Sequence, residues 1–362
     1  MVALFYKTLE DKFRGSRDLI KSRLQIYKAF IEPIKAIYPK AQILDLGCGR
    51  GEWLEYVTEL GFLAEGVDLD ENMLEEGKKL GFNVHIDNAI SFLKKLPNES
   101  YAVISAFHFV EHITFDDLQT LVEQSLRVLQ PGGLLLMETP NPENIIVGTL
   151  EFYIDPTHEK PIPPNLLAFL PEYYGFLKTK ILRLQEAKNL AHSQNISLTD
   201  VLCNVSPDYA VIAQKKHLLE KSNDILSILQ INEAFEIEYG ITLTQLMMKY
   251  DEQNLTRQKC LELDLAELKE QIDNLKNKCG ANHELESIYK SFSWKITRPL
   301  RKIKSLCRHL LFLIDELTLN KKKHRLSPSK TKSNIEPSKN YISFRTMKIY
   351  DAIHKAQIKR RN

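Results

Sequence analysis

Glycines and aspartates near the start of the chain have the spacing of a nucleotide-binding turn. Gly47, Gly49 and Gly51 lie in the segment ILDLGCGRGEW, and Asp45 precedes them. Glycines let the backbone turn sharply and approach a ligand closely where a strand of an α/β sheet ends. Asp68 follows seventeen residues after Gly51, where a carboxylate can bind both ribose hydroxyls of an adenosine. The GxGxG spacing differs from the GxGxxG of dinucleotide-binding proteins, so it argues against NAD.

Two histidines and an aspartate follow later apolar segments and could take part in proton transfer. His112 lies in AFHFVEHI, where its ring could take a proton from an attacking hydroxyl or simply cap the end of a strand. Asp155 and His158 lie in EFYIDPTHEKPIPP, a loop stiffened by prolines. They could hydrogen-bond each other or an acceptor, or the loop could be a turn held by its own Asp and Thr side chains. Tyr153 of the same loop is a further candidate for acceptor binding.

Seven short apolar segments alternate with helical stretches and predict the sheet that positions these residues. They are AQILDLG, LAEGVDL, NVHI, YAVISAF, GGLLLMET, TKILRLQ and YAVIAQK. An amphipathic helix from Ile20 to Pro39 precedes them. The first five segments predict a parallel, doubly wound α/β sheet, and the last two can close it as its sixth and seventh strands, which gives a seven-stranded, Rossmann-like fold. We expect the folded domain, with its N-terminal helices, to occupy residues 1–216.

The glycine turn and Asp68 resemble the first two motifs of class I S-adenosylmethionine (SAM)-dependent methyltransferases, and the resemblance covers residues 41–139. It implies that SAM is the cofactor, with Asp68 on the ribose and Leu69 against the adenine. The acid-Ala pair of the family falls on Asp87-Asn88-Ala89, so that either Asp87 or Asn88 would contact the adenine. The complete cofactor set that the resemblance implies is Asp45, Gly47, Cys48, Gly49, Gly51, Asp68, Leu69, Asp87, Asn88, Ala89 and Phe107.

The Glu-His pair in AFHFVEHI is similar to that of many small-molecule and sugar O-methyltransferases, which implies catalytic roles for His112, Asp155 and His158. The DPTH loop and FYKTLEDKFRGSRDLIKSRL near the N-terminus resemble methyltransferases of bacterial surface polysaccharide synthesis, including the methyltransferase part of O-antigen chain terminators. This resemblance implies methylation of a terminal sugar hydroxyl or phosphate on a lipid-linked glycan. The alternatives are a methyltransferase for an unrelated, quinone-like molecule, and a scaffold whose degenerate domain recruits glycosyltransferases.

Arginines of the N-terminal segment are candidates for binding an anionic acceptor or the carboxylate of the cofactor. Arg14, Arg17 and Arg23 supply the donors, although arginines on a helix surface are often only solvated. The five cysteines show no metal-ligand spacing, and we predict no metal site.

The C-terminal part of the chain predicts attachment to partners. Residues 217–286 are expected to be helical. A heptad seam at 258–279 predicts a short coiled coil and a homo-oligomer; the alternative is a helix folded back on the domain. Residues 287–317 have the pattern of a basic amphipathic helix, and residues 318–362 that of a basic, disordered tail.

The charge is divided unevenly along the chain. The total is +2, yet Ser287–Asn362 carry 20 Lys or Arg and 4 Asp or Glu, which leaves −14 for the preceding residues. Such a basic segment is attracted to anionic lipids; binding to a protein partner or, less expected, to nucleic acid are the alternatives. No apolar run is long enough to span a bilayer or to act as a signal peptide. We therefore expect a cytoplasmic protein that is peripheral on the inner membrane, where it meets lipid-linked glycans or a membrane-bound glycosyltransferase complex.

Overall fold

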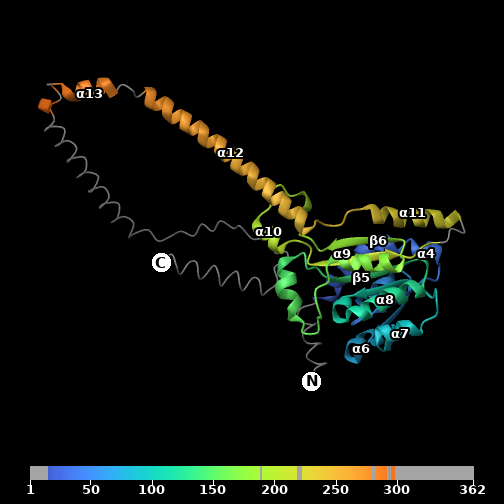
Figure 1. The fold of residues 1–362 in the computed structure, drawn as a ribbon. Coiled ribbons are helices and arrows are strands. Elements are labelled where there is room, and N and C mark those ends of the chain that lie inside the picture. The colour runs from blue at the N-terminus through green and yellow to red at the C-terminus, as the bar shows by residue number, and fades with distance from the viewer. Residues whose placement is uncertain are drawn as a thin grey trace. The chain divides into compact units, whose positions relative to one another are not determined.

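The computed structural model describes residues 15–187, 190–217, 222–278, 282–291, 293 and 295–297. Seven strands form one sheet in the order β3-β2-β1-β4-β5-β7-β6 (Figure 1). They are β1 (Gln42–Leu46), β2 (Leu63–Asp68), β3 (Asn83–Ile86), β4 (Tyr101–Phe107), β5 (Leu129–Pro140), β6 (Lys178–Leu184) and β7 (Asp208–Gln214). The predicted seven-stranded, Rossmann-like fold is confirmed.

The sheet is mixed: the first five strands are parallel, as their alternation with helices predicts, and one later strand is antiparallel. The pairs among β1 to β5 are parallel, and β7 runs antiparallel to both β5 and β6. Neighbouring antiparallel strands can follow one another along the chain without the crossover that parallel strands need. In the antiparallel pair of β5 and β7, Asp208 at the start of β7 lies beside Pro140, the last residue of β5.

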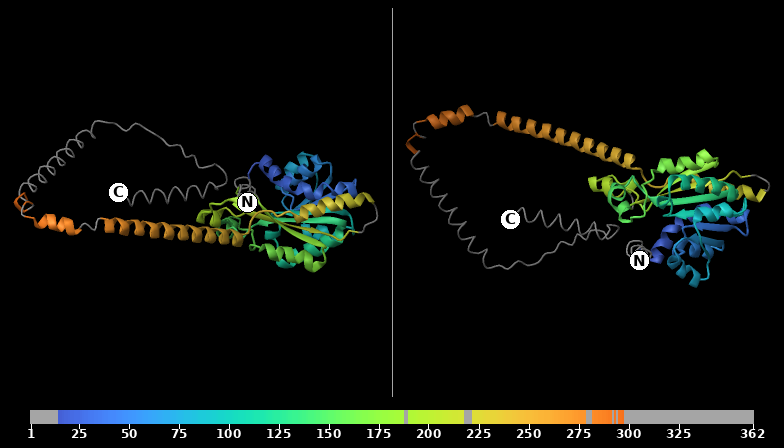
Figure 2. Two further views of the ribbon diagram at one scale, coloured as in Figure 1. Left: turned by 90° about the horizontal axis from the view of Figure 1, so that it is seen from above. Right: turned by 60° about the horizontal axis from the view of Figure 1, so that its bottom comes forward.

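Helices cover both faces of the sheet, as Figures 1 and 2 show. One face carries α7 (Ala89–Lys95), α8 (Phe115–Val128) and α9 (Pro164–Tyr174). The other carries α2 (Arg17–Leu24), η1 (Gln25–Tyr27), α3 (Lys28–Ile31), α4 (Ile34–Ile37), α5 (Glu52–Glu59) and α11 (Ser222–Glu236). Successive strand residues alternate between the two cores: Leu44 and Ile104 pack on the first face, and Ile43 and Val103 on the second. This alternation makes the domain doubly wound.

The remaining helices are short or lie outside these two layers. They are α6 (Glu71–Lys79), η2 (Val110–His112), η3 (Val147–Glu151), η4 (Phe152–Ile154), η5 (Leu190–His192), α10 (Leu198–Cys203), α12 (Leu243–Lys278) and α13 (Asn282–Lys290). Among the described residues, no helix combines the length and the apolarity needed to cross a membrane.

The N-terminal helix is broken into short pieces, although the sequence analysis treated it as one helix ending at Pro39. A 3-10 turn interrupts it after Leu24, and Pro33 caps a separate piece, α4. Proline lacks an N–H and clashes with the preceding turn of a helix. The pieces nevertheless keep one buried face, with Tyr27, Phe30 and Ile34 fully enclosed.

The first compact unit extends to Gln253, beyond residue 216 where the sequence analysis placed the end of the domain. The additional residues belong to the unit because α11 buries Ile231 and Phe235 in the core of the second face. In the first turns of α12, Leu246 packs against Leu190 and Val201.

The second unit begins at residue 254 and contains the rest of α12 and α13. Every side chain from Leu255 to residue 277 is exposed. Arg14, Cys279, most of the predicted basic helix and the whole of the predicted tail 318–362 lie outside the described residues.

Candidate active site

The glycine turn follows β1 and leads into α5. Gly47, Gly49 and Gly51 have φ angles of 72°, 49° and 78°, in the left-handed region that side chains disfavour. A β-carbon on Gly47 would lie 2.5 Å from Cδ2 of Phe109. The backbone N–H groups of Gly47 and the buried Cys48 donate to the Val67 carbonyl at 2.8 and 3.1 Å. These bonds hold the turn against the end of β2.

Asp68 lies beside this turn, as its spacing predicts. Its carboxylate accepts hydrogen bonds from the backbone N–H groups of Gly49 and Asp70, both at 2.9 Å. The next residue, Leu69, is 67% exposed, which leaves an apolar surface for an adenine ring. Asp45 is buried within β1 instead and accepts a hydrogen bond from the Ser105 hydroxyl at 2.7 Å, so it supports the strand under the turn.

The remaining residues of the predicted cofactor set lie at the end of β3 or in the core. Asp87 pairs with Lys95 at 2.7 Å, and Asn88 caps α7 by accepting from the Ser91 N–H at 2.9 Å. Either side chain could still reach an adenine. Ala89 and Phe107 are buried, and the Phe107 ring packs in the core beneath the site.

The DPTH loop positions His112 through a chain of hydrogen bonds. The Thr157 hydroxyl donates to the Asp155 carboxylate at 2.6 Å and lies 2.8 Å from Nδ1 of His112. A hydroxyl has a single proton to donate, so Nδ1–H of His112 must be the donor to Thr157. Asp155 therefore orients His112 through Thr157, a residue absent from the predicted set.

His158 contacts His112 directly. The ring centroids are 4.6 Å apart, and Nδ1 of His158 donates to the Phe152 carbonyl at 2.6 Å. Burial lowers the pKa of His158 below its usual value. Because Nδ1 carries the donated proton in each ring, Nε2 is the acceptor atom whenever the ring is neutral. Tyr153 is exposed on the same loop, where it remains a candidate for acceptor binding.

The loop is fixed to the sheet at two points. The backbone N–H of Glu159 donates to the Glu111 carbonyl at 2.8 Å, and the Tyr209 hydroxyl donates to the Ile162 carbonyl at 2.7 Å. The loop therefore lies against η2 and β7, at the edge of the sheet where parallel strands of this fold class bind ligands.

A group of titratable residues, absent from the predicted set, lies between the loop and the core. His108 has a φ of 50°, and its two ring nitrogens each lie 3.4 Å from a carboxylate, Nδ1 from Glu111 and Nε2 from Glu138. Tyr27 donates a hydrogen bond to Glu138. Asp208 completes the group at the start of β7, within reach of His108 and Glu138. Non-glycine residues with positive φ are strained and are often found at functional sites.

Burial and charge act in opposite directions on this group. Burial disfavours the charged form of His108, but the Glu111 and Glu138 carboxylates outweigh it and raise the pKa of His108. Burial likewise opposes charge on Glu111, yet the hydrogen bond and the positive charge of His108 lower the Glu111 pKa. Burial raises the pKa of Asp208 to about 6. The sequence signal for this group was limited to the spacing of three between His108 and Glu111 in AFHFVEHI.

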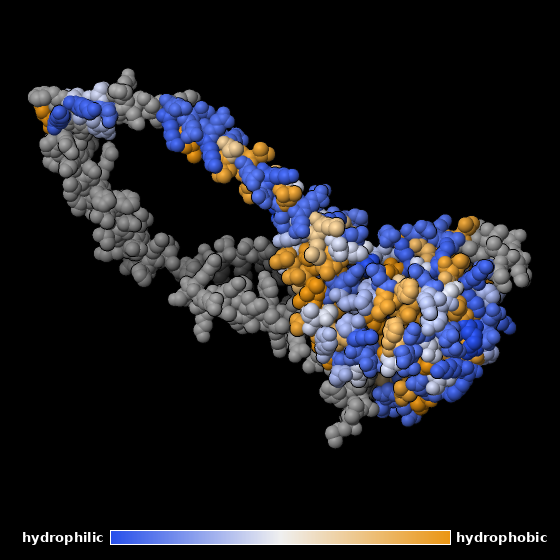
Figure 3. All heavy atoms as spheres, in the orientation of Figure 1, coloured by the Kyte–Doolittle hydropathy of each residue, from blue (hydrophilic) through white to orange (hydrophobic). Residues whose placement is uncertain are grey.

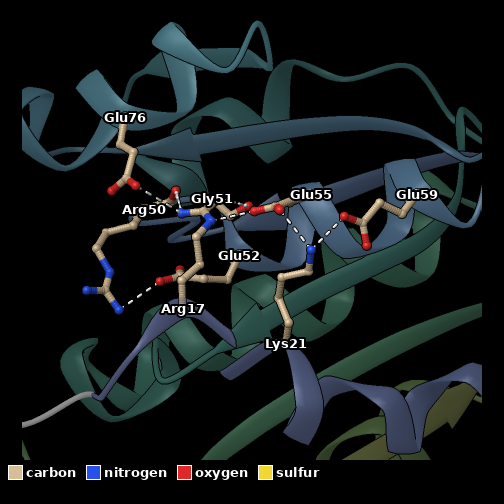
Figure 4. A network of polar contacts seen from close by, with 8 residues as sticks. All are labelled: Arg17, Lys21, Arg50, Gly51, Glu52, Glu55, Glu59 and Glu76. Carbon is tan, nitrogen blue, oxygen red and sulfur yellow. Dashed lines mark hydrogen bonds and ion pairs between the residues drawn. The ribbon is translucent and has the colours of Figure 1, made fainter. Parts of the chain in front are cut away.

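Of the predicted arginines, Arg17 is engaged within the protein, as Figure 4 shows. Its guanidinium donates to the carbonyls of Arg50 and Gly51 at 3.0 and 3.3 Å and pairs with Glu55. Lys21 binds the same Glu55 at 2.7 Å. These contacts fasten α2 to the glycine turn.

Arg23, on the same helix as Arg17, lies close enough to Asp208 for the two charges to interact. Its positive charge acts to lower the pKa of Asp208, against the larger effect of burial. Arg23 therefore belongs to the edge of the sheet that carries the histidines, whereas Arg14 lies outside the described residues.

Comparison with known proteins agrees with this geometry. The family model of a methyltransferase domain matches residues 20–192. The crystal structure of a SAM-dependent methyltransferase from Archaeoglobus fulgidus is 34% identical, with a TM-score of 0.52, and the match covers 58% of this chain and 100% of that one. The chain therefore belongs to the SAM-dependent methyltransferases, whose cofactor is SAM. The glycine turn, the Asp68 carboxylate and the exposed Leu69 fit that cofactor.

Two curated relatives match shorter parts of the chain. A protein named a probable SAM-dependent methyltransferase of Mycolicibacterium smegmatis is 29% identical over 134 residues, which are 37% of this chain and 51% of that protein. A ubiquinone biosynthesis O-methyltransferase of a Bradyrhizobium species is 32% identical over 103 residues, 28% of this chain and 40% of the relative. The chain thus spans about half the length of these relatives, or less.

Proposed function

We propose that the protein is a SAM-dependent O-methyltransferase whose acceptor is a hydroxyl group, in particular the terminal sugar hydroxyl of a lipid-linked bacterial surface glycan. The observation that carries the proposal is the pair His112 and His158, whose hydrogen bonds leave Nε2 of each neutral ring as a proton acceptor. Both rings lie at the ligand-binding edge of the sheet.

Methyl transfer from SAM is an in-line displacement in which the sulfonium supplies both the methyl group and the leaving group. The protein's part is to position the reactants and exclude water. The glycine turn and Asp68 would hold the cofactor, while Asp155 and Thr157 orient His112. The imidazole pair takes up the proton of the attacking hydroxyl, a step that general bases typically accelerate by 10²–10⁴-fold.

The imidazole pair favours a hydroxyl over a phosphate as the acceptor. A phosphate oxygen is already anionic at neutral pH and needs no base, whereas a sugar hydroxyl is weakly nucleophilic until its proton is removed. Methylation of a terminal phosphate would therefore not use His112 and His158 as bases. Capping of a glycan chain and decoration of its end are equally served by this chemistry.

The basic C-terminal segment supports a membrane-bound acceptor. Ser287–Asn362 carry 20 Lys or Arg against 4 Asp or Glu. Each basic residue near an anionic bilayer contributes about 1 kcal/mol, so such a segment would hold the enzyme on the cytoplasmic face of the inner membrane. The full chain should then sediment with anionic vesicles at low salt, whereas a chain truncated after residue 286 should stay in the supernatant. Equal sedimentation of both chains would remove this support.

A small phenolic acceptor is the second candidate, because some relatives are named ubiquinone biosynthesis O-methyltransferases. A phenol hydroxyl would use the same imidazole pair and would not need the basic segment. A scaffold with a degenerate domain would use neither the cofactor site nor the histidines.

The test is methyl transfer from radiolabelled SAM by the full chain to lipid-linked polysaccharide, beside a catechol as the phenolic acceptor. We expect label in the polysaccharide, a loss of at least 100-fold in kcat for His158→Ala, and little change for the exposed His192→Ala. Transfer to the catechol alone would favour the small-molecule candidate. SAM binding without transfer to either acceptor would contradict the proposed acceptors. No SAM binding at all would contradict the proposal that the protein is a methyltransferase.

A further inference from the structure

We propose that Glu111, His112 and His158 form a binding site for a divalent first-row transition metal ion. One potential ligand atom from each of the three residues lies within 4.8 Å of the others. The residues come from η2 and from the DPTH loop, which the Glu159 N–H to Glu111 carbonyl bond joins. The spacing of the cysteines predicts no metal site, and local spacing does not reveal this set, because Glu111 and His112 lie more than forty residues from His158.

The hydrogen bonds of both imidazoles match those of metal ligands. Metal-binding histidines usually donate their second ring N–H to a carboxylate or a carbonyl, which fixes the tautomer and the ring orientation. Nδ1 of His158 donates to the Phe152 carbonyl, and Nδ1 of His112 donates to Thr157, which in turn donates to Asp155. The lone pair of each neutral ring is therefore at Nε2.

Glu111 provides the second, independent observation. It is 1% exposed, and its Oε2 accepts a hydrogen bond from the Thr139 hydroxyl at 2.9 Å. Its Oε1 is buried and makes no hydrogen bond of regular geometry among the described residues; Nδ1 of His108 lies 3.4 Å away in an ion pair. A buried carboxylate oxygen without a hydrogen bond is costly. A cation held between this oxygen and the two imidazoles would remove that cost.

The donor set indicates the kind of ion. Two imidazole nitrogens and one carboxylate suit Zn²⁺, Fe²⁺, Co²⁺ or Ni²⁺, whereas Mg²⁺ prefers oxygen ligands and retained water. Three protein ligands leave at least one coordination position for an acceptor oxygen, as in catalytic zinc sites. A single carboxylate also leaves the ion with a net positive charge, which favours an anionic ligand.

The role of the ion rests on the proposed function, whereas its binding does not. With the ion bound, the acceptor hydroxyl coordinates it as a Lewis base, its pKa falls, and its proton passes to water. The oxygen lone pair then attacks the methyl carbon, and the electron pair of the carbon–sulfur bond leaves with the sulfur. In this mode the imidazoles hold the ion and do not take the proton themselves. No oxidation or reduction takes place.

Titration of the tag-free, metal-stripped full chain with Co²⁺ tests the site, because Co²⁺ bound to histidine nitrogens absorbs visible light. We expect one Co²⁺ per chain with visible absorption, displaced by one equivalent of Zn²⁺. His158→Ala and Glu111→Gln should weaken binding by at least tenfold. Thr157→Val removes the acceptor of the His112 Nδ1–H together with the hydroxyl donor to Asp155, and loss of such an outer partner typically costs 10–100-fold in metal affinity.

Two control variants separate this site from other sources of binding. His192→Ala removes an exposed histidine outside the cluster and should leave the titration unchanged. Asp208→Asn alters the neighbouring group of His108, Glu138 and Asp208. If Co²⁺ binding is lost in Asp208→Asn but kept in His158→Ala, the ion binds to the neighbouring group and the proposal is overturned. Titration with SAM should give wild-type affinity in each variant, which shows that the domain is folded.

The outcomes for the metal and for the proposed function are distinguishable. Absence of visible Co²⁺ absorption, or a spectrum unchanged by His158→Ala in a folded variant, would overturn the metal site. If methyl transfer to a hydroxyl nevertheless continues in the presence of EDTA, the imidazoles act as bases and the proposed function stands. Co²⁺ binding without transfer to any hydroxyl acceptor would leave the metal site and remove the proposed function.

Discussion

Hydrogen bonds within the protein hold the Asp68 carboxylate in an orientation that suits a nucleotide ligand. Two backbone N–H groups, from Gly49 and Asp70, hold the carboxylate at the ends of β1 and β2. The carboxylate is therefore preorganised, and a ligand need not meet the entropy cost of ordering it. It can still accept from ribose hydroxyls, since an ionised carboxylate has about four acceptor sites.

We expect Asp68→Ala to weaken SAM binding by more than 100-fold. Two hydrogen bonds to a charged group, at about 1.5–3 kcal/mol each, correspond to at least that factor. Isothermal titration of the full chain with SAM measures the effect. Asp70→Ala is the matched control, because the Asp70 side chain caps α6 through the Asn72 N–H and only its backbone contacts Asp68. Equal losses in the two variants would mean that the turn, and not the carboxylate, was disrupted.

Asp208 should make the stability of the protein depend on pH. Its pKa is raised from 3.8 to about 6 by burial, so the folded state holds the proton more tightly than the unfolded state. The resulting stabilisation is complete below pH 3.8 and is lost as the pH rises through 6. Asp208→Asn cannot lose a proton. Its free energy of unfolding relative to wild type should therefore increase between pH 4 and pH 7, by at most about 3 kcal/mol.

Urea denaturation at several pH values measures this difference. The Asn side chain can still accept the hydrogen bond that the Gln185 amide donates at 3.0 Å, so packing is largely kept. The exposed Asp116→Asn on α8 serves as the control. A pH-independent difference between Asp208→Asn and wild type would show that the carboxyl ionises alike in the folded and unfolded states.

The place of the glycine turn beside Asp68 could be predicted from the sequence because the two lie at a fixed spacing at the ends of adjacent strands. The positions of Gly47, Gly49 and Asp68 depend only on two adjacent strands and the turn between them. The acceptor side could be predicted only in part. Thr157 and Glu111 act through contacts between η2 and a loop more than forty residues away, and no local spacing reveals such a contact.

At the scale of elements, the glycine turn shows how a backbone conformation creates the site. Gly47 combines a left-handed φ of 72° with a β-carbon position 2.5 Å from the Phe109 ring. Gly81 has a similar φ of 81°, but nothing lies within 4 Å of its β-carbon position. Substitutions of the two glycines therefore separate the free-energy cost of a left-handed backbone from the cost of a β-carbon that clashes with Phe109.

We expect Gly81→Ala to destabilise the protein by about 1–2 kcal/mol, the usual cost of a left-handed alanine. Gly47→Ala should cost several kcal/mol in total, because Phe109 must also move. It should also weaken SAM binding, which Gly81→Ala should not. Urea denaturation and SAM titration of both variants measure these effects. Equal destabilisation by the two substitutions would show that the ring of Phe109 yields at no cost.

The direction of β7 was beyond the reach of sequence patterns. The segments of β6 and β7 were recognised by their apolar residues, yet an apolar run has the same composition whichever way it runs. β7 lies between β5 and β6 and runs antiparallel to both. Its first residue, Asp208, therefore lies beside the end of β5. A buried acid at the active-site edge is thus a consequence of strand direction.

At the scale of the whole molecule, α12 carries a stripe of apolar side chains outside the first unit. The stripe consists of Leu261, Leu265, Leu268, Ile272 and Leu275, each at least half exposed. Figure 3 shows apolar side chains along α12 among hydrophilic ones. Their alternating spacing of four and three residues is that of a coiled-coil seam.

The charges beside the stripe specify one arrangement of two helices. With Leu265 and Ile272 at a positions and leucines at d, Asp264 falls at g and Lys269 at the following e position. In a parallel pair these two residues of opposite chains attract each other, and Ile at a with Leu at d, as in Ile272 and Leu275, favours two strands. We therefore expect a parallel homodimer through residues 258–279.

Leu268→Asp should convert this dimer into a monomer, because it places a charge in the seam, where the two chains would bury it. Leu263→Asp is the matched control: Leu263 is 70% exposed, lies on the same helix, and occupies the outward f position. Light scattering after size-exclusion chromatography of the full chain measures the mass. If wild type is already a monomer, or if both substitutions dissociate the protein alike, the heptad stripe is not the interface. If only Leu268→Asp dissociates it, the double variant Asp264→Lys with Lys269→Asp should remain a dimer, since a parallel pair regains its attraction when both charges are exchanged.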